Sequence, residues 1–158
     1  MPQFLWLHEH MEHCQNMAAW LYEQFSYEYV GQSLIEWQHE FAAGQHNGEW
    51  PSVVAVNNGE LLGGAALAKD DLPGRDDLGP WLACVFVTPP ARGQGIAEAL
   101  VEKVCERARA DGVERLYLHT QDRAGYYARR GWVMVEQFER WGKPQSLMSR
   151  QLQATLRQ

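Results

Sequence analysis

The sequence has few of the features that mark secreted, membrane-spanning or metal-binding proteins. Its 158 residues include three cysteines, Cys14, Cys84 and Cys105, and none of them belongs to a CxxC pair. This spacing provides neither a disulfide framework nor a zinc ribbon, so we expect reduced thiols. No apolar run approaches the roughly 18 residues of a membrane helix, and the first residues do not resemble a signal peptide. We therefore expect a cytoplasmic protein with no membrane partner.

Basic side chains are scarce in the first half of the chain. Residues 1–77 carry two basic and twelve acidic side chains, a net charge of −10, whereas residues 78–158 carry twelve basic and eight acidic side chains, a net charge of +4. The total of −6 argues against a nucleic-acid partner, because proteins that bind nucleic acids present basic surfaces. Scattered solvated charge explains the asymmetry, and so do two ligand surfaces, one for a cation and one for an anion.

The remaining composition is typical of a globular domain. Hydrophobic residues make up 46% and charged residues 22% of the chain, which suffices for a buried core. Apolar residues at spacings of three and four predict helices over about residues 10–29, 33–44, 94–110 and 122–130. Short apolar runs predict strands over residues 3–8, 52–57, 60–68, 81–87, 113–120, 132–138 and 146–152. We expect a mixed α/β sheet in one domain spanning residues 1–158, without repeats.

Local signals mark where several of these elements begin and end. Ser33 followed by Glu36 forms a capping box at a helix start, and Gly44 is expected to end that helix. Asn58-Gly59 predicts a tight hairpin between two strands. Asp122 is expected to cap the last short helix.

Residues 85–104 carry the strongest chemical signal. A buried strand stops at a proline pair, turns through Arg92-Gly93-Gln94-Gly95 and continues directly into an amphipathic helix. The first amide groups of a helix lack intrahelical partners and carry partial positive charge, and glycines let a ligand approach the backbone. The run matches neither GxxxxGK nor GxGxxG. We interpret it as a pyrophosphate-binding turn, with an ordinary tight strand-to-helix turn as the alternative.

Two motifs carry a resemblance to a known family. The run R-x-x-G-x-A at residues 92–97, after a strand ending V-x-V-x-P, resembles the acyl-coenzyme A signature of the GNAT N-acetyltransferase superfamily. The run AGYYARRGW at residues 124–132 is similar to that superfamily's A-x-x-[FY]-x-x-x-G-[FW] ending. The resemblance spans the chain, is strongest over residues 80–138 and is nearest to a bacterial subgroup with unassigned acceptors. It implies a central, mixed but mostly antiparallel sheet with splayed middle strands and about four helices.

The resemblance also implies where acetyl-CoA, the co-substrate, would bind. Residues 80–158 would form the acetyl-CoA half and residues 1–79 the acceptor side. Main-chain groups of Val85 and Val87 would face the pantetheine arm and the acetyl carbonyl. The pyrophosphate would bind to the backbone amides of Arg92, Gly93, Gln94, Gly95, Ile96 and Ala97. The family chemistry needs no metal, so we interpret the histidines near the N-terminus as solvated side chains and not as ligands.

The catalytic residues are only partly implied. Tyr127 matches the tyrosine that protonates the departing thiolate, and Tyr126 is the better candidate for core packing. Many members carry a glutamate base on the strand equivalent to residues 81–87, which here contains no acid. The proton would then pass to His119, to an acid of the 70–77 loop, to Cys84 or to a water chain, with His119 favoured.

A second departure from the family pattern concerns the pantetheine arm. Many members bind it with an asparagine, and Thr120, Gln121 and Asp122 stand at that place in this sequence. Whether one of these side chains replaces the asparagine stays open.

The acceptor side is acidic, which favours a cationic amine. Asp70 and Asp71 are candidate acceptor-binding residues, and Trp81 is a candidate aromatic wall. We therefore expect direct transfer of an acetyl group from acetyl-CoA to the primary amine of a small cationic molecule. The alternatives are a non-catalytic acyl-CoA sensor and an N-terminal acetyltransferase of proteins or peptides. The chain is expected to be a monomer or, through an exposed final strand at residues 146–152, a homodimer.

Overall fold

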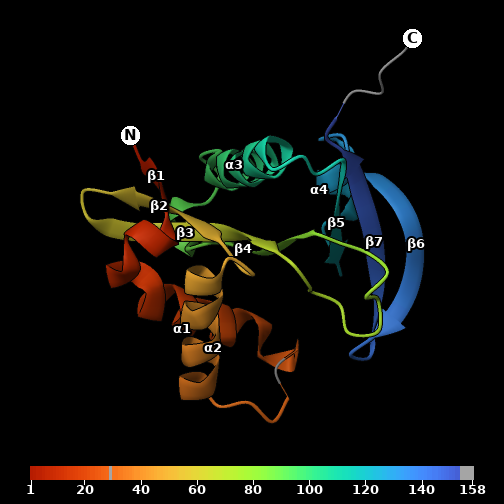
Figure 1. Cartoon of the computed structure of the whole chain (residues 1–158). Helices are drawn as coiled ribbons and strands as arrows, with labels where there is room; N and C mark the ends of the chain where they lie inside the picture. Colours follow the sequence, from red (N-terminus) through yellow and green to blue (C-terminus); the bar gives the residue numbers. More distant parts are fainter. Residues whose placement is uncertain (29, 154–158) are drawn as a thin grey trace.

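One seven-stranded sheet carries the fold, with helices on both of its faces (Figure 1). The computed structural model describes residues 1–28 and 30–153. The strands are β1 (Gln3–Trp6), β2 (Ser52–Asn57), β3 (Glu60–Ala68), β4 (Trp81–Val87), β5 (Arg115–Thr120), β6 (Val133–Arg140) and β7 (Lys143–Gln151). The α-helices are α1 (Cys14–Phe25), α2 (Leu34–Asn47), α3 (Ile96–Ala110) and α4 (Ala124–Ala128). Short 3₁₀ turns are η1 (Leu7–Glu9), η2 (Met11–His13), η3 (Ser26–Glu28) and η4 (Pro89–Ala91).

The strand order is β1-β2-β3-β4-β5-β7-β6, and neighbours are antiparallel except for β4 and β5. These two parallel strands pair at Trp81 and Tyr117 and at no other position within the described residues. They therefore diverge toward their C-terminal ends in the middle of the sheet. The predicted mixed α/β sheet with splayed central strands is confirmed.

The two faces of the sheet bury separate apolar clusters. On one face α3 packs against β2, β3 and β4, and it buries residues at spacings of three and four such as Leu100, Val104 and Ala108. On the other face α1 and α2 cover the N-terminal half of the sheet (Figure 1). Within the described residues, none of the helices combines the length and the apolar character needed to span a bilayer.

Several predicted helix ends were wrong. The helix expected over residues 10–29 is α-helical only over Cys14–Phe25, between the 3₁₀ turns η2 and η3, and residue 29 lies outside the described residues. At two other ends a glycine explains the difference. Helix α2 passes Gly44 and ends before Gly48, which takes the left-handed φ of 78°. A Cβ at Gly44 would lie 2.6 Å from the Cβ of Trp50, so this glycine serves close packing and not helix termination. Helix α3 starts at Ile96, because Gly95 with a φ of 81° is still its N-cap. The capping box of Ser33 and Glu36 is confirmed.

Two predictions near the C-terminus were also wrong. Asp122 does not cap α4; the N-cap residue is Arg123, whose amide donates to the Thr120 hydroxyl at 3.1 Å. The final strand β7 is not an exposed edge, because it lies between β5 and β6. The edge strand at this end of the sheet is β6, in which Val133, Met134 and Val135 are exposed.

Candidate active site

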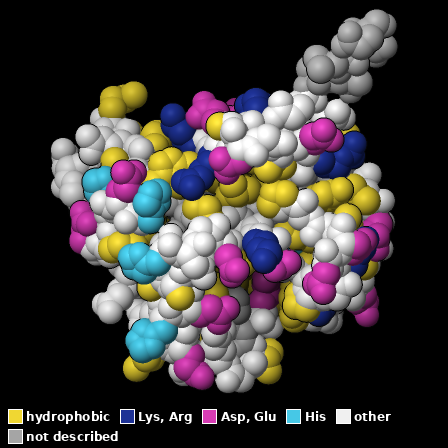
Figure 2. All heavy atoms as spheres, in the orientation of Figure 1, with side chains coloured by type: hydrophobic (Ala, Val, Ile, Leu, Met, Phe, Trp, Pro, Cys, Tyr) yellow, Lys and Arg dark blue, Asp and Glu magenta, His cyan; other side chains and the backbone are white. Residues whose placement is uncertain are grey.

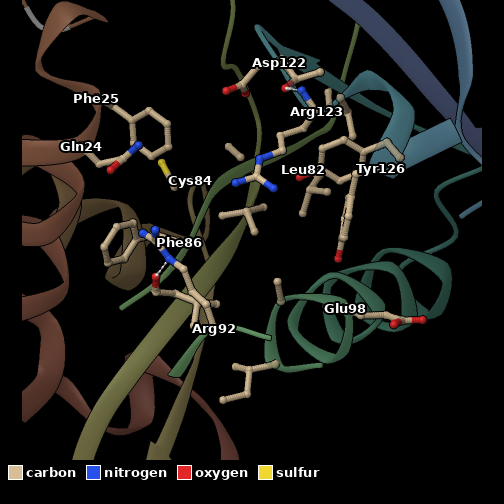
Figure 3. Close-up of a pocket in the computed structure, with 18 of the residues that line it drawn as sticks. Gln24, Phe25, Leu82, Cys84, Phe86, Arg92, Glu98, Asp122, Arg123 and Tyr126 are labelled. Atoms are coloured by element: carbon tan, nitrogen blue, oxygen red, sulfur yellow. Dashed lines mark hydrogen bonds between the residues drawn. The ribbon is translucent and has the colours of Figure 1, made fainter. Parts of the chain in front are cut away.

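A cleft of about 670 Å³ opens where β4 and β5 diverge. Its walls come from the end of α1 and η3, from β4, from the start of α3, from the end of β5 and from α4 (Figure 3). Acidic side chains gather around a basic one near the centre of the face shown in Figure 2. The cleft thus brings together residues from both halves of the sequence.

A bulge in β4 turns the backbone toward this cleft. Cys84 has a φ of 56°, in the left-handed region that side chains rarely adopt, and the pairing of β3 with β4 shifts register between Gly64 and Ala66. Beyond Trp81, β4 has no ladder partner in β5 within the described residues. Main-chain N–H and C=O groups around Val85 are therefore available to a ligand in the cleft.

The start of α3 forms one end of the cleft. Gly93 and Gly95 have φ values of 79° and 81°, and a Cβ at either would face open space. Among the described residues, no side chain caps this helix end, so its first amides carry their partial positive charge into the cleft. Arg92 donates from Nε to the carbonyl of Val87 at 2.8 Å and holds the turn against the strand.

Of the eight residues predicted to bind the cofactor, seven line the cleft. They are Val85, Val87, Arg92, Gly93, Gly95, Ile96 and Ala97. Gln94 lies in the same turn but outside the lining.

Two arginines that the sequence analysis did not single out also line the cleft. Arg123 reaches into it from the residue before α4 (Figure 3). The guanidinium of Arg130 stacks on the Tyr126 ring, 3.7 Å from its centroid, and donates to the Tyr126 carbonyl at 3.0 Å. The positive charge of the C-terminal half indicated an anion-binding surface, but it did not indicate which arginines line the cleft.

Tyr126 and Tyr127 both line the cleft, at right angles to each other with ring centroids 5.1 Å apart. The expectation that Tyr126 is the core residue was wrong. Tyr127 is the buried member and packs against Trp132. Burial, with a smaller contribution from Tyr126, raises the pKa of Tyr127 to about 12, so its hydroxyl keeps its proton at neutral pH.

His119, at the end of β5, pairs with Asp71 of the β3–β4 loop. Its Nε2 lies 3.0 Å from Asp71 Oδ2, and the two side chains are only 6% and 15% exposed. The imidazole also packs against the rings of Trp81 and Trp141. Burial alone would lower the pKa of His119, but its hydrogen bond to Asp71 and the charges of Asp71 and Glu28 raise it above the ordinary value. The histidine is therefore held by a buried carboxylate, an arrangement suited to accepting a proton.

The 3₁₀ turn η3 supplies two lining residues that the sequence analysis missed. Burial, and then the charge of Asp71, raises the pKa of Glu28 to about 7. The neighbouring Tyr27 ring lies edge-on to Trp141 with centroids 5.7 Å apart, so η3 touches the β6–β7 turn. No motif marks these residues, because the pattern around them indicates only the end of a helix.

The other predicted residues are distributed as follows. Asp71 lines the cleft, whereas Asp70 is exposed and Trp81 is fully buried, and neither belongs to the lining. Cys84, Thr120 and Asp122 line the cleft and Gln121 does not. Within residues 1–28 and 30–153, no group of three histidine, cysteine or acidic side chains is placed to hold a metal ion.

Comparison with known proteins identifies the family. The profile of the Acetyltransferase (GNAT) family matches residues 14–132. No curated protein matches the sequence. Among solved structures, the Salmonella typhimurium protein yncA with its cofactor acetyl-CoA is 16% identical, with a TM-score of 0.72 over 100% of this chain and 98% of its own.

Two further solved structures have a TM-score of 0.72 with this chain. An N-acetyltransferase from Staphylococcus aureus Mu50 is 19% identical, with 97% of this chain and 99% of that chain covered. An aminoglycoside 6′-N-acetyltransferase complexed with coenzyme A is 18% identical, with coverage of 90% and 93%. These similarities show a shared fold, and the profile match over most of the chain shows that it belongs to the GNAT acetyltransferase family.

Proposed function

We propose that this protein is an N-acetyltransferase that moves an acetyl group directly from acetyl-CoA to the primary amine of a small cationic acceptor. One observation carries the proposal: a single cleft joins the uncapped start of α3 to the His119–Asp71 pair, with Tyr127 in its wall. Residues 80–158 supply the cofactor side, and residues 1–79 supply most of the acceptor side.

The residues of the cleft fit acetyl-CoA, which supplies an acetyl thioester when bound. The amides of residues 92–97 suit a pyrophosphate, because a helix start favours anions, and Arg123 and Arg130 add positive charge beside it. The side of β4 that diverges from β5 suits the amide-containing pantetheine arm. An amide N–H of this strand would also stabilise the negative charge that grows on the carbonyl oxygen during attack.

His119 and Tyr127 divide the two proton transfers. As the acceptor nitrogen forms its bond to the acetyl carbon, the proton it loses passes to His119, and Asp71 stabilises the resulting imidazolium. As the carbon–sulfur bond breaks, the Tyr127 hydroxyl protonates the sulfur. The raised pKa of Tyr127 supports this role, because the group stays protonated until the thiolate leaves.

The acidic acceptor side supports a cationic acceptor. Glu28 and Asp71 line that end of the cleft, and the N-terminal half carries a strong negative charge that would attract amines. An acidic peptide would be repelled by the same surface.

The proposal is tested by incubating the protein with acetyl-CoA and a panel of amines and peptides, with acetylated products detected by mass spectrometry. Direct product detection avoids thiol reagents, which would react with cysteines. We expect acetylated small amines, and we expect His119→Asn to lower kcat at least about 100-fold. The matched control is His39→Asn, an exposed position on α2 outside the cleft.

Other outcomes would contradict the proposal. Binding of acetyl-CoA by calorimetry without any product would indicate a sensor module. Acetylation restricted to peptide N-termini would indicate an N-terminal acetyltransferase.

A further inference from the structure

Within the described part of residues 1–79, two acids line the cleft, Glu28 and Asp71, and they differ in their partners. The Asp71 carboxylate is paired with His119, with Oδ2 lying 3.0 Å from His119 Nε2. Glu28 lines the same cleft, half-buried, and within the described residues it forms no ion pair with a lysine or an arginine. Its charge nevertheless acts on both Asp71 and His119. Glu28 thus lines the cleft with a hydrogen bond to Tyr27 but without a lysine or arginine partner among the described residues, and a bound cation would favour its ionised form.

Contacts of the residue before Glu28 hold η3 in place. Tyr27, the preceding residue, packs edge-on against Phe25 at the end of α1 and against Trp141 of the β6–β7 turn. The same Trp141 ring lies 5.7 Å from the His119 ring, centroid to centroid. Trp141 therefore links η3 to the His119–Asp71 pair, and Glu28 lies close enough for its charge to act on His119.

The chemistry of acetyl transfer limits which group of the acceptor Glu28 could bind. The attacking nitrogen must be neutral, because its lone pair forms the new bond, and its proton belongs to His119. A nitrogen held by a carboxylate as an ammonium ion is protonated and cannot attack. A carboxylate in addition to the His119–Asp71 pair is therefore matched to a second cationic group on the acceptor. The Tyr27 ring, 39% exposed beside it, adds a face for such a cation.

We propose that Glu28 is the specificity-determining residue of the acceptor site, and that it binds a second, non-reacting ammonium group so that diamines are preferred over monoamines. The inference rests on the proposed function and narrows its substrate class. A single acetyl group is transferred to one nitrogen, while the other nitrogen stays charged against Glu28.

The test compares kcat/KM for 1,4-diaminobutane and butylamine, which share a carbon chain and differ in the second amino group. We expect the wild-type protein to prefer the diamine about tenfold or more, the effect of a hydrogen bond between charged groups. Glu28→Gln should remove most of this preference, because KM should rise more for the diamine than for butylamine. Glu23→Gln, the same change at an exposed position of α1 outside the cleft, should keep the preference.

Equal use of both amines by the wild-type protein, or an unchanged preference in Glu28→Gln, would overturn the inference and leave the proposed function intact. If neither amine is acetylated, the amine panel described above decides the proposed function, and calorimetry decides the role of Glu28. Binding of 1,4-diaminobutane to the coenzyme A-saturated protein that is lost in Glu28→Gln would support the inference. Equal binding by both proteins, or no binding, would reject it.

Discussion

The two ends of the cleft are built in different ways. At the α3 end the groups proposed to bind the ligand are consecutive backbone amides, set by two glycines with left-handed φ values and by a helix start without a side-chain cap among the described residues. At the η3 end they are side chains, Glu28, Asp71 and His119, from three separate segments. The first end needs only local geometry, whereas the second depends on how the whole chain folds. Mutations at the α3 end should therefore change acetyl-CoA affinity, whereas mutations at the η3 end should change catalysis.

The largest expected effect is at His119. His119→Asn should lower kcat at least about 100-fold, because the proton acceptor is lost, while the dissociation constant of acetyl-CoA stays within about twofold. Steady-state kinetics and calorimetry measure the two quantities. A parallel loss of acetyl-CoA affinity would show that the two ends are not separate.

The next effect is at the helix start. Gly95→Val should weaken acetyl-CoA binding about tenfold, because a β-branched residue at a φ of 81° is strained and the amides would turn away. Gly112→Val, at a φ of 84° after the other end of α3, is the matched control. It should lower stability by a similar amount and leave the acetyl-CoA affinity unchanged.

The pH dependence of kcat/KM should depend on ionisable groups at the η3 end of the cleft and not on the α3 end. Because His119 must be deprotonated to accept a proton and its pKa is raised, kcat/KM should rise with pH and level off above the ordinary histidine value of 6.5. Asp71→Asn removes the partner that raises this pKa and leaves the opposing effect of burial, so the midpoint should move to lower pH. An unmoved midpoint would assign the ionisation to another group, with Glu28 the first candidate.

The smallest effect is expected at the capping box that follows η3. Ser33→Ala removes the acceptor of the Glu36 amide hydrogen bond and should lower the free energy of unfolding by about 1 kcal/mol. Denaturant titration measures this loss. If KM for the amine rises as well, the start of α2 contributes to the placement of η3. Acetyl-CoA affinity should not change in either case.

The same contrast explains what could be predicted from the sequence. The turn at residues 92–97 and the Tyr127 motif are continuous runs whose chemistry is local, and the structure brings both to the cleft. The hairpin and the capping box were predicted for the same reason. His119 was singled out as the first candidate for the base, but its partner could not be chosen among several acids of the 70–77 loop.

The features that were missed or wrongly predicted depend on contacts between residues that are far apart in the sequence. Glu28 carries no motif, and its turn η3 is joined to His119 through Trp141, which lies more than a hundred residues later in the chain. Gly44 reads as a helix end unless the position of Trp50 is known. The order β5-β7-β6 was missed because a hairpin has the same sequence pattern whichever of its strands takes the edge.

The single pairing between β4 and β5 links folding to ligand binding. In most sheets the main-chain N–H and C=O groups of neighbouring strands bond to each other. Within the described residues, β4 and β5 form one such pairing, so their facing groups beyond it are left to water or to a ligand. A ligand that pairs with β4 acts as a missing strand segment and adds to the stability of the folded state. At a free concentration 100 times its dissociation constant, that contribution is about 2.7 kcal/mol. Under the proposed function, acetyl-CoA bound between β4 and β5 should therefore raise the melting temperature as its concentration rises.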